Sequence, residues 1–320
     1  MDTEDFRQFL QGRKIPEDKV EPFIFIADKF EGLLQGRKPD SSDVEIFAMM
    51  LIREGLNAWD HFIALARYGQ FLENTEVYRE AIALLDGSEV LDNLHERLGV
   101  LVGEQKRDEI LAGVDLPPLG LPTSHKPRVL QAVMERLEAM LDVEMCDKLL
   151  SSSLRTLKDS SYLEDKNKYQ VCASFDEFLV KRGQEFIAHL EQLKGEGRMF
   201  FTQEVTDDVI AFVRGNPLIS QGVREGNVLY EIKIPYMTKE YLAATDERMK
   251  HYYYCHCPWV RESIKNGDVR VSPRFCQCSA GFVKKLWEVV LGQPLEAQVV
   301  ESVLTGDLWC KIAIHLPDGI

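Results

Sequence analysis

The sequence has no stretch of about 20 consecutive apolar residues, the length that a membrane-spanning helix needs. Its first residues, MDTEDFRQFLQGRK, lack the basic start and the apolar run of a secretory signal, so we expect a cytoplasmic location and no membrane partner. Basic residues are also in deficit: 38 Lys and Arg face 52 Asp and Glu, which gives a net charge of −14. Because nucleic-acid binding needs clustered basic residues, this composition argues against that class of protein.

What is present is the composition of a globular protein, with 45% hydrophobic and 28% charged residues over 320 positions. This length suits one large or two medium domains. Apolar residues recur three or four positions apart in the first third of the chain, which predicts helices over residues 20–34, 46–52, 58–72, 77–85 and 90–102. The motif Ser42-Asp-Val-Glu45 predicts a capping box before the second of them. We therefore expect residues 1–112 to form a helical bundle, whose helices are candidates for binding a protein partner.

Residues 113–127 carry four prolines and two glycines, a composition that disfavours both helix and strand. Either a linker or an ordered surface loop fits this segment. Beyond it, the spacing of apolar residues predicts one long helix over 129–154 and another from a capping box at Ser174–Glu177 to about Gly195.

The last part of the chain has a different pattern. Alternation of apolar and polar residues predicts strands over 227–234, 295–304 and 308–316, and the tyrosines at 252–254 also favour a strand. A turn at Thr305-Gly306-Asp307 would join two of these strands as a hairpin, with Asp307 satisfying the turn amides. The predicted fold class is α+β: a helical N-terminal part, followed over 128–320 by helices that lead into a domain with an antiparallel sheet.

Cysteines are concentrated in this last part. Four of the seven fall within 24 residues, as two Cys-x-Cys pairs, Cys255/Cys257 and Cys276/Cys278. In an extended segment, residues i and i+2 point to the same side, so each pair is able to present two sulfur atoms to one point. His251 and His256 add nitrogen donors nearby.

Four interpretations of the cluster remain open. The four thiolates bind zinc or a similar soft metal, with His251 or His256 able to replace one sulfur. Alternatively, Cys276 or Cys278 is a nucleophile at the start of a helix predicted from Ala280, with His256 as its base. Third, Cys276 and Cys278 form a reversible disulfide. Finally, all four cysteines are small buried hydrophobic residues.

Basic residues accompany the cysteines. Between residues 248 and 285 eight basic residues face two acidic ones, a local charge of +6 in a protein of net charge −14. Positive potential favours thiolates and attracts anions, so Arg261 and Arg274 are candidate anion ligands. Trp259 and Phe275 are candidates for the wall of an apolar pocket. The plain alternatives are solvated surface for the basic residues and core packing for the aromatic ones.

The stretch 251–317 resembles a family of uncharacterised bacterial proteins. The matching motifs are YCHCPW at 254–259, FCQCSAGF at 275–282 and ESVLTGDLWC at 301–310. A cysteine before a helix, followed by two strands with Gly306-Asp307-x-x-Cys310, is more remotely similar to the vinyl-reductase (small-molecule-binding) domain and to the L-2-amino-thiazoline-4-carboxylic acid hydrolase family. This resemblance implies a compact α+β fold that binds hydrophobic or small anionic molecules, with Cys276 and Cys310 facing the ligand.

The sequence thus predicts a cytoplasmic protein that binds a small molecule or a metal ion such as zinc at a cysteine-rich site in its C-terminal domain. One alternative is a cysteine-dependent hydrolase of a small anionic amide or thiazoline-like compound, in which Cys276 or Cys278, His256 and Arg274 act together. A second alternative is a non-catalytic interaction module.

Overall fold

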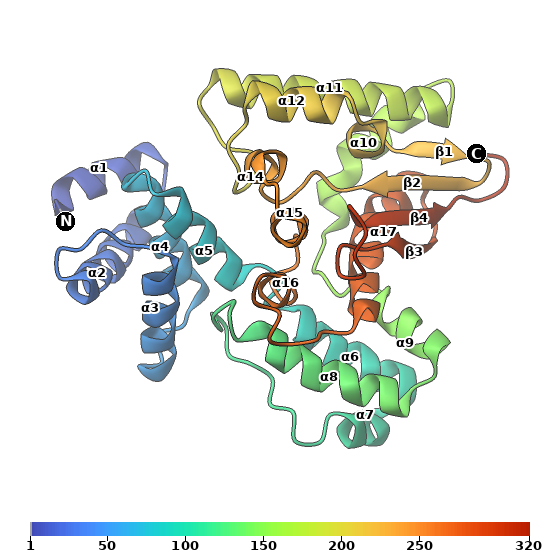
Figure 1. Cartoon of the computed structure of the whole chain (residues 1–320). Helices are drawn as coiled ribbons and strands as arrows, with labels where there is room; N and C mark the ends of the chain where they lie inside the picture. The colour runs from blue at the N-terminus through green and yellow to red at the C-terminus, as the bar shows by residue number, and fades with distance from the viewer. Residues whose placement is uncertain (1) are drawn as a thin grey trace. The chain divides into compact units, whose positions relative to one another are not determined.

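The computed structural model describes residues 2–320, and the chain divides into two compact units (Figure 1). The first unit contains the residues up to Ser88 together with Asp115–Val129, and the second contains Glu89–Val114 and Leu130–Ile320. In the part of the chain that the structure describes, no helix is long and apolar enough to cross a membrane.

The first unit is helical. Its core is rich in aromatic side chains, and Phe6, Phe30, Phe47, Phe62 and Tyr68 are all buried in it. Among the described residues up to Ser88, four of five helices were predicted from the periodicity of apolar residues, and the first one, over residues 3–12, was not. The five helices are α1 (Thr3–Gly12), α2 (Glu17–Leu34), α3 (Ser41–Arg53), α4 (Trp59–Phe71) and α5 (Thr75–Leu85).

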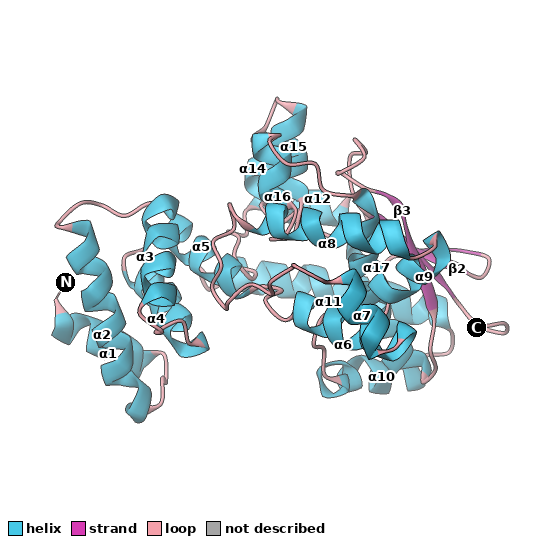
Figure 2. Ribbon diagram, turned by 90° about the horizontal axis from the view of Figure 1, so that it is seen from below, coloured by secondary structure: helices cyan, strands magenta, loops and turns pink. Residues whose placement is uncertain are grey.

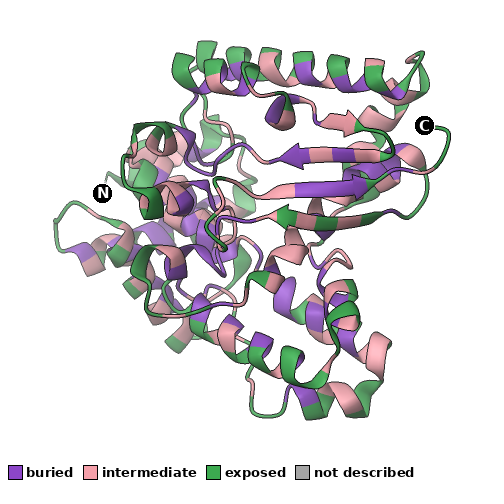
Figure 3. Ribbon diagram, turned by 45° about the vertical axis from the view of Figure 1, so that its right-hand side comes forward, coloured by how far each residue is buried: buried purple, intermediate pink, exposed green. Residues whose placement is uncertain are grey.

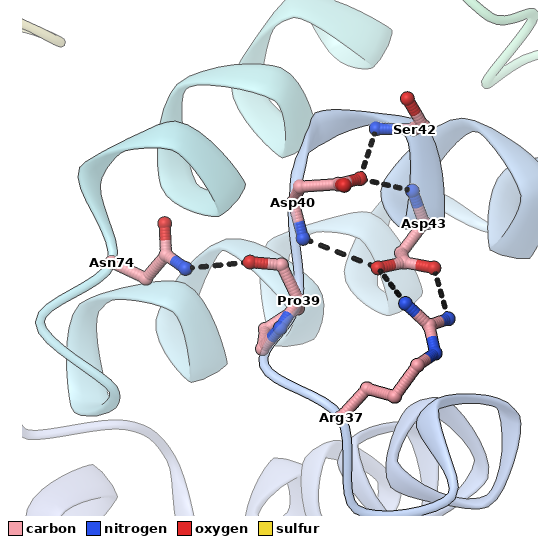
Figure 4. A network of polar contacts seen from close by, with 6 residues as sticks. All are labelled: Arg37, Pro39, Asp40, Ser42, Asp43 and Asn74. Atoms are coloured by element: carbon pink, nitrogen blue, oxygen red, sulfur yellow. Dashed lines mark hydrogen bonds and ion pairs between the residues drawn. The ribbon is translucent and has the colours of Figure 1, made fainter.

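Helix α3 begins earlier than the sequence predicts. Its capping box is formed by Asp40 and Asp43, each of which accepts a hydrogen bond from the backbone N–H of the other (3.1 and 3.2 Å; Figure 4). Arg37 donates to both carboxylate oxygens of Asp43 and lowers the pKa of that side chain. The predicted capping box at Ser42–Glu45 is wrong because Glu45 binds elsewhere: it accepts two hydrogen bonds from Ser124.

The Pro-rich segment packs on the first unit. The carbonyl oxygen of Leu119 accepts a hydrogen bond from Asn57 (3.0 Å), and Thr123 donates to Glu45 and Glu80. Gly120 has a φ of +84° and lies against the ring of Phe62, where a Cβ atom would stand 2.0 Å from a ring carbon. Of the two predicted alternatives, the ordered loop describes residues 115–125.

The second unit contains all the strands among the described residues (Figure 2). Its first helices, up to α13, are α6 (Val90–Val102), α7 (Glu104–Ile110), most of α8 (Lys126–Met140), α9 (Val143–Leu150), the 3-10 turn η1 (Asp159–Tyr162), α10 (Leu163–Gln170), α11 (Phe175–Gly195), α12 (Asp207–Arg214) and α13 (Pro217–Ser220). The elements that follow are β1 (Val223–Glu225), β2 (Val228–Ile232), α14 (Thr238–Ala243), α15 (Glu247–Tyr254), α16 (Arg261–Asn266), the 3-10 turn η2 (Pro273–Cys276), α17 (Gln277–Leu291), β3 (Glu296–Glu301) and β4 (Lys311–His315).

The strands form one antiparallel sheet in the order β1-β2-β4-β3. The inner strands β2 and β4 are the most buried, whereas residues of the edge strand β3 alternate between exposed and half-buried (Figure 3). Between Val299, opposite Ile312, and Glu301, opposite Lys311, the register shifts by one residue, so Val300 forms a bulge. These features confirm the predicted fold class, including the hairpin between the last two strands.

Two apolar clusters hold the helices against the sheet. In one, Trp287 and Val290 of α17 and Phe178 of α11 pack on Leu229 of β2 and Ile312 of β4. The second cluster joins the end of α11 to α12 and to the end of β2 with the residues after it, and includes Leu190, Val209, Ile232 and Ile234. Helix α17 is thus fixed on one face of the sheet, which positions the cysteines at its start.

Two predicted elements are wrong. The predicted helix over 129–154 is two helices, α8 and α9. Asp142 lies between them and caps the start of α9, because its carboxylate accepts a hydrogen bond from the N–H of Met145 (2.8 Å). The tyrosines at 252–254 lie in helix α15 rather than in a strand. Asp246 caps that helix (2.8 Å to the N–H of Met249), and tertiary packing of Tyr254 outweighs its strand propensity.

Candidate functional site: a cluster of thiols beside Lys233

Three segments of the second unit bring the cysteines to one region. Cys255 ends α15, and Cys257 follows it in the loop before α16. Cys276 and Cys278 stand at the start of α17, and Cys310 directly precedes β4. The hydroxyl of Tyr254 ties these segments together, because it donates to the carbonyl oxygens of Lys233 (3.1 Å) and Cys310 (3.4 Å).

The thiols affect one another. Burial raises the pKa of Cys255 well above its usual range, and the neighbouring thiols of Cys257, Cys310 and Cys276 raise it further. Burial also raises the pKa of Cys278 to about 12, with Cys257 as the next cause. The structure therefore brings the two Cys-x-Cys pairs to the same region and adds Cys310 to them. We call these five residues the thiol cluster; each is a free thiol.

Ser302 links two members of the cluster. Its hydroxyl oxygen lies 3.3 Å from the sulfur of Cys276 and 4.0 Å from that of Cys310. Burial raises the pKa of Cys276, and the hydrogen bond with Ser302 opposes that rise. Ser302 is itself buried, and the backbone N–H of Leu304 donates to its hydroxyl (3.1 Å), so the side chain is fixed in place.

Lys233 is a member of the site that the sequence analysis missed. Its ammonium lies 3.4 Å from the hydroxyl oxygen of Ser279 and 4.5 Å from the centre of the Phe282 ring. Burial is the main cause that lowers its pKa, and the positive charge of Arg155 lowers it further, while Cys310, Cys278 and Cys257 act in the opposite direction. Within residues 2–320, no carboxylate lies within 4.0 Å of this ammonium.

The two histidines have different surroundings. The Nε2 atom of His256 lies 2.5 Å from the carbonyl oxygen of Ile234, so this nitrogen faces the backbone. His251 is buried, and within the described residues its Nε2 atom has no hydrogen-bond partner. His251 lies close enough to Asp307 to contribute to the lowered pKa of that carboxyl group, whose main causes are the backbone N–H of Ser302 and the hydroxyl of Thr305.

The predicted anion ligands are engaged within the protein. Arg261 is 2% exposed, and its guanidinium lies 4.4 Å from the ring centre of Tyr236 and 5.6 Å from that of Tyr252. Arg274 forms ion pairs with Asp147 (2.7 Å) and Glu138 (3.5 Å). These contacts use the guanidinium groups that the sequence analysis assigned to an anion.

The predicted pocket aromatics are core residues. Trp259 and Phe275 are 2% and 1% exposed, and neither lines the cavity of about 300 Å³ beside Ser302 and Gln277. Of the predicted site residues, the structure therefore brings Cys255, Cys257, Cys276 and Cys278 together.

A cavity of about 300 Å³ lies beside the cluster. Ser302 and Gln277 form part of its wall, and Gln277 stands between Cys276 and Cys278 in the chain. Its charged lining consists of the carboxylates of Glu138, Asp147 and Glu301 and the guanidinium of Arg274. Cavities that bind small molecules start at about this volume.

The cluster does not form a ready set of metal ligands. Within residues 2–320, no group of three or more His, Cys, Asp or Glu side chains is placed to hold a metal ion. Raised pKa values mean in addition that each sulfur must lose a proton before it binds a metal. The zinc site predicted at Cys255, Cys257, Cys276 and Cys278 stays a prediction for metal analysis.

Comparisons of this chain with protein-family models, with curated proteins and with solved structures found no match. The fold and the thiol cluster are therefore the basis for the function, and the resemblances of residues 251–317 stay predictions.

Proposed function

We propose that the C-terminal α+β domain binds a small molecule, and that the thiol cluster with the adjoining cavity is its binding site. The observation that carries this proposal is the position of Ser302. Its side chain contacts the sulfur atoms of Cys276 and Cys310, and the same residue lines the cavity of about 300 Å³. A molecule in the cavity would thus contact a residue whose hydroxyl group also contacts two of the thiols.

The charged residues that line the cavity indicate which charge the ligand carries. Arg274 is paired with Asp147 and Glu138, and Glu301 lies 3.6 Å from the ammonium of Lys311. Three carboxylates against one guanidinium in the lining favour a neutral or basic molecule over a strongly acidic one. The resemblance of residues 251–317 implies a hydrophobic or a small anionic ligand. Of these two, the charges of the cavity favour the hydrophobic one, because the carboxylates repel an anion.

Binding is better supported than nucleophilic catalysis. A cysteine nucleophile needs a thiolate and a nearby base. Burial raises the pKa of both Cys276 and Cys278, so they are thiols at neutral pH. The Nε2 atom of His256, the base in the hydrolase alternative, faces a backbone carbonyl oxygen.

A thiol-protection experiment tests the proposal. The full chain is incubated with the fraction of a cell extract below about 1 kDa, and the rate of alkylation by N-ethylmaleimide is measured at each cysteine by peptide mass spectrometry. We expect slower alkylation of Cys276 and Cys310 in the extract and an unchanged rate at Cys172, which lies outside the cluster. Equal rates with and without the extract would contradict small-molecule binding.

The same experiment separates an organic ligand from a metal ion. Extract that has been passed over a chelating resin keeps its organic molecules and loses its metals. If the treated extract no longer protects the thiols, the site binds a soft metal, as the sequence predicted, and adding Zn²⁺ back should restore protection. Protection that survives the resin supports the organic ligand. We further propose that the protein works in the cytoplasm, where thiols of this kind stay reduced.

A further inference from the structure

We propose that Lys233 forms an imine with a carbonyl compound, an aldehyde or a ketone, that binds at the thiol cluster. The inference rests on the proposed small-molecule site and names the chemical class of its ligand. It is carried by the surroundings of the Lys233 amine, which differ from those of an ordinary surface lysine.

The first feature is the absence of a counter-charge. Several surface lysines of this protein pair with carboxylates, as Lys168 does with Glu164 (2.7 Å) and Glu185 (2.8 Å). In the described part of the chain, no carboxylate lies within 4.0 Å of the Lys233 ammonium. No ion pair among the described residues therefore stabilises its positive charge.

The second feature is the set of groups that replace the carboxylate. The amine lies on the ring of Phe282, 4.5 Å from its centre, and the guanidinium carbon of Arg155 lies 5.7 Å from the same ring. Other neighbours of the Lys233 amine include Cys257, Cys278 and Cys310, which carry no charge as thiols. An apolar surface and a second cation are the two conditions that keep a lysine amine neutral and nucleophilic near pH 7.

Lys233 directly follows strand β2, which ends at Ile232. Residues alternate between the two faces of a strand, so Lys233 lies on the same face as Leu229, which packs against Ala280 and Trp287 of α17. Lys233, Ser279 and Phe282 are each half-buried rather than fully enclosed. These three residues therefore lie near the surface of the second unit rather than in its apolar core.

The reaction balances without an oxidant or a reductant. The lone pair of the Lys233 nitrogen attacks the carbonyl carbon, and the new C–N bond forms as the carbonyl electron pair moves to oxygen. The nitrogen then gives up its two protons, the oxygen leaves with them as water, and a C=N double bond remains. The Ser279 hydroxyl, 3.4 Å from the amine, is placed to donate a hydrogen bond to that oxygen.

Reductive trapping tests the inference. The full chain is incubated near pH 7 with benzaldehyde, whose ring suits the Phe282 surface, and with cyanoborohydride, which reduces imines to stable amines. The rate of modification is measured at each lysine by peptide mass spectrometry. Lys284 is the internal control, because it lies on the same helix as Ser279 but pairs with Glu288 (3.4 Å) and donates to the carbonyl oxygen of Leu295 (3.1 Å).

We expect Lys233 to react several-fold faster than Lys284, since a lowered pKa leaves a larger fraction of the amine neutral near pH 7. Lys233→Arg should abolish the fast modification at position 233, and Lys284→Arg should leave the rate at Lys233 unchanged. Arg155→Gln should slow the modification of Lys233, because it removes the neighbouring positive charge. Equal rates at Lys233 and Lys284 in the unchanged protein would overturn the imine. That failure is distinct from failure of the binding site, which is judged by the protection of Cys276 and Cys310 in cell extract.

Discussion

The indole nitrogen of Trp287 donates a hydrogen bond of 3.1 Å to the carboxylate of Glu231, and both side chains are buried. The second oxygen of Glu231 binds Arg182 (3.1 Å), whose guanidinium lies 5.3 Å from the centre of the Trp287 ring. This arrangement joins α17, β2 and α11 through one carboxylate. It fixes the helix that carries Cys276 and Cys278 on the strand that leads to Lys233.

Replacement of Glu231 by Ala should destabilise the protein. The change leaves the buried indole N–H without an acceptor and Arg182 without its partner, so we expect a loss of about 2 kcal/mol in the free energy of unfolding. Urea denaturation measures it. The matched control is Glu225→Ala on the exposed edge strand β1, which should stay within about 0.5 kcal/mol. Equal effects of the two substitutions would show that the buried carboxylate contributes nothing.

Gly281→Ala should also destabilise the protein, although Ala is the better helix former. A Cβ atom at Gly281 of α17 would lie 2.7 Å from the carbonyl oxygen of Ser151 and 2.8 Å from the N–H of Ser153, and backbone atoms yield little. We expect a net loss of about 1–3 kcal/mol in thermal or urea denaturation. Gly195→Ala at the end of α11 meets nothing within 4 Å and should be neutral or slightly stabilising. A stable G281A variant would contradict the close approach of α17 to this loop.

The alkylation rate of Cys278 should rise steeply with pH. Because the pKa of Cys278 is raised to about 12, its thiolate fraction grows about tenfold per pH unit between about pH 7 and 9. Iodoacetamide labelling followed by peptide mass spectrometry gives the profile. Arg155→Gln should lower the rate further, since the positive charge of Arg155 favours the thiolate. A plateau below about pH 9 would contradict the raised pKa.

Asp307 should stabilise the fold in a pH-dependent way. Its carboxylate accepts hydrogen bonds from the N–H of Ser302 (2.8 Å) and the hydroxyl of Thr305 (2.8 Å), which lower its pKa. A carboxyl whose pKa is lower in the folded state stabilises that state above the unfolded pKa of about 3.9, and this contribution is lost as pH falls through the folded value. The difference in unfolding free energy between the wild type and Asp307→Asn should therefore shrink below about pH 4. A difference that grows with acidity would contradict this assignment.

Local patterns in the sequence predicted much of the fold. The spacing of apolar residues located α2, α4, α5 and α6, and alternation located β2, β3 and β4. The turn role of Asp307 is confirmed, because it depends on neighbours within five residues. The predictions failed where a distant partner decided the outcome, as when Ser124 bound Glu45 and so removed it from the predicted capping box.

In the candidate site, too, the sequence predicted what depends on neighbouring residues and missed what depends on distant ones. The density of cysteines near 255–278 pointed to the right region, but Lys233 and Ser302 are distant in sequence from these cysteines. One clue was available for Lys233: alternation puts it on the face of Leu229, where a charged residue is unusual. No local pattern marks Ser302, since its importance comes from sulfur atoms that are 26 residues before it and 8 residues after it.

The bulge at Val300 sets a limit on how the length of this chain can change. Because of the extra residue, Glu301 stands opposite Lys311 and accepts a hydrogen bond from the indole of Trp309 (2.7 Å), instead of sharing the apolar side of Ala297 and Val299. Loss of the bulge with Val300 still paired in the strand would turn the Glu301 carboxylate towards the apolar side, whereas deletion of Val300 would leave Glu301 opposite Lys311. Among the residues of β3, Val300 should therefore be the one whose deletion the sheet tolerates best.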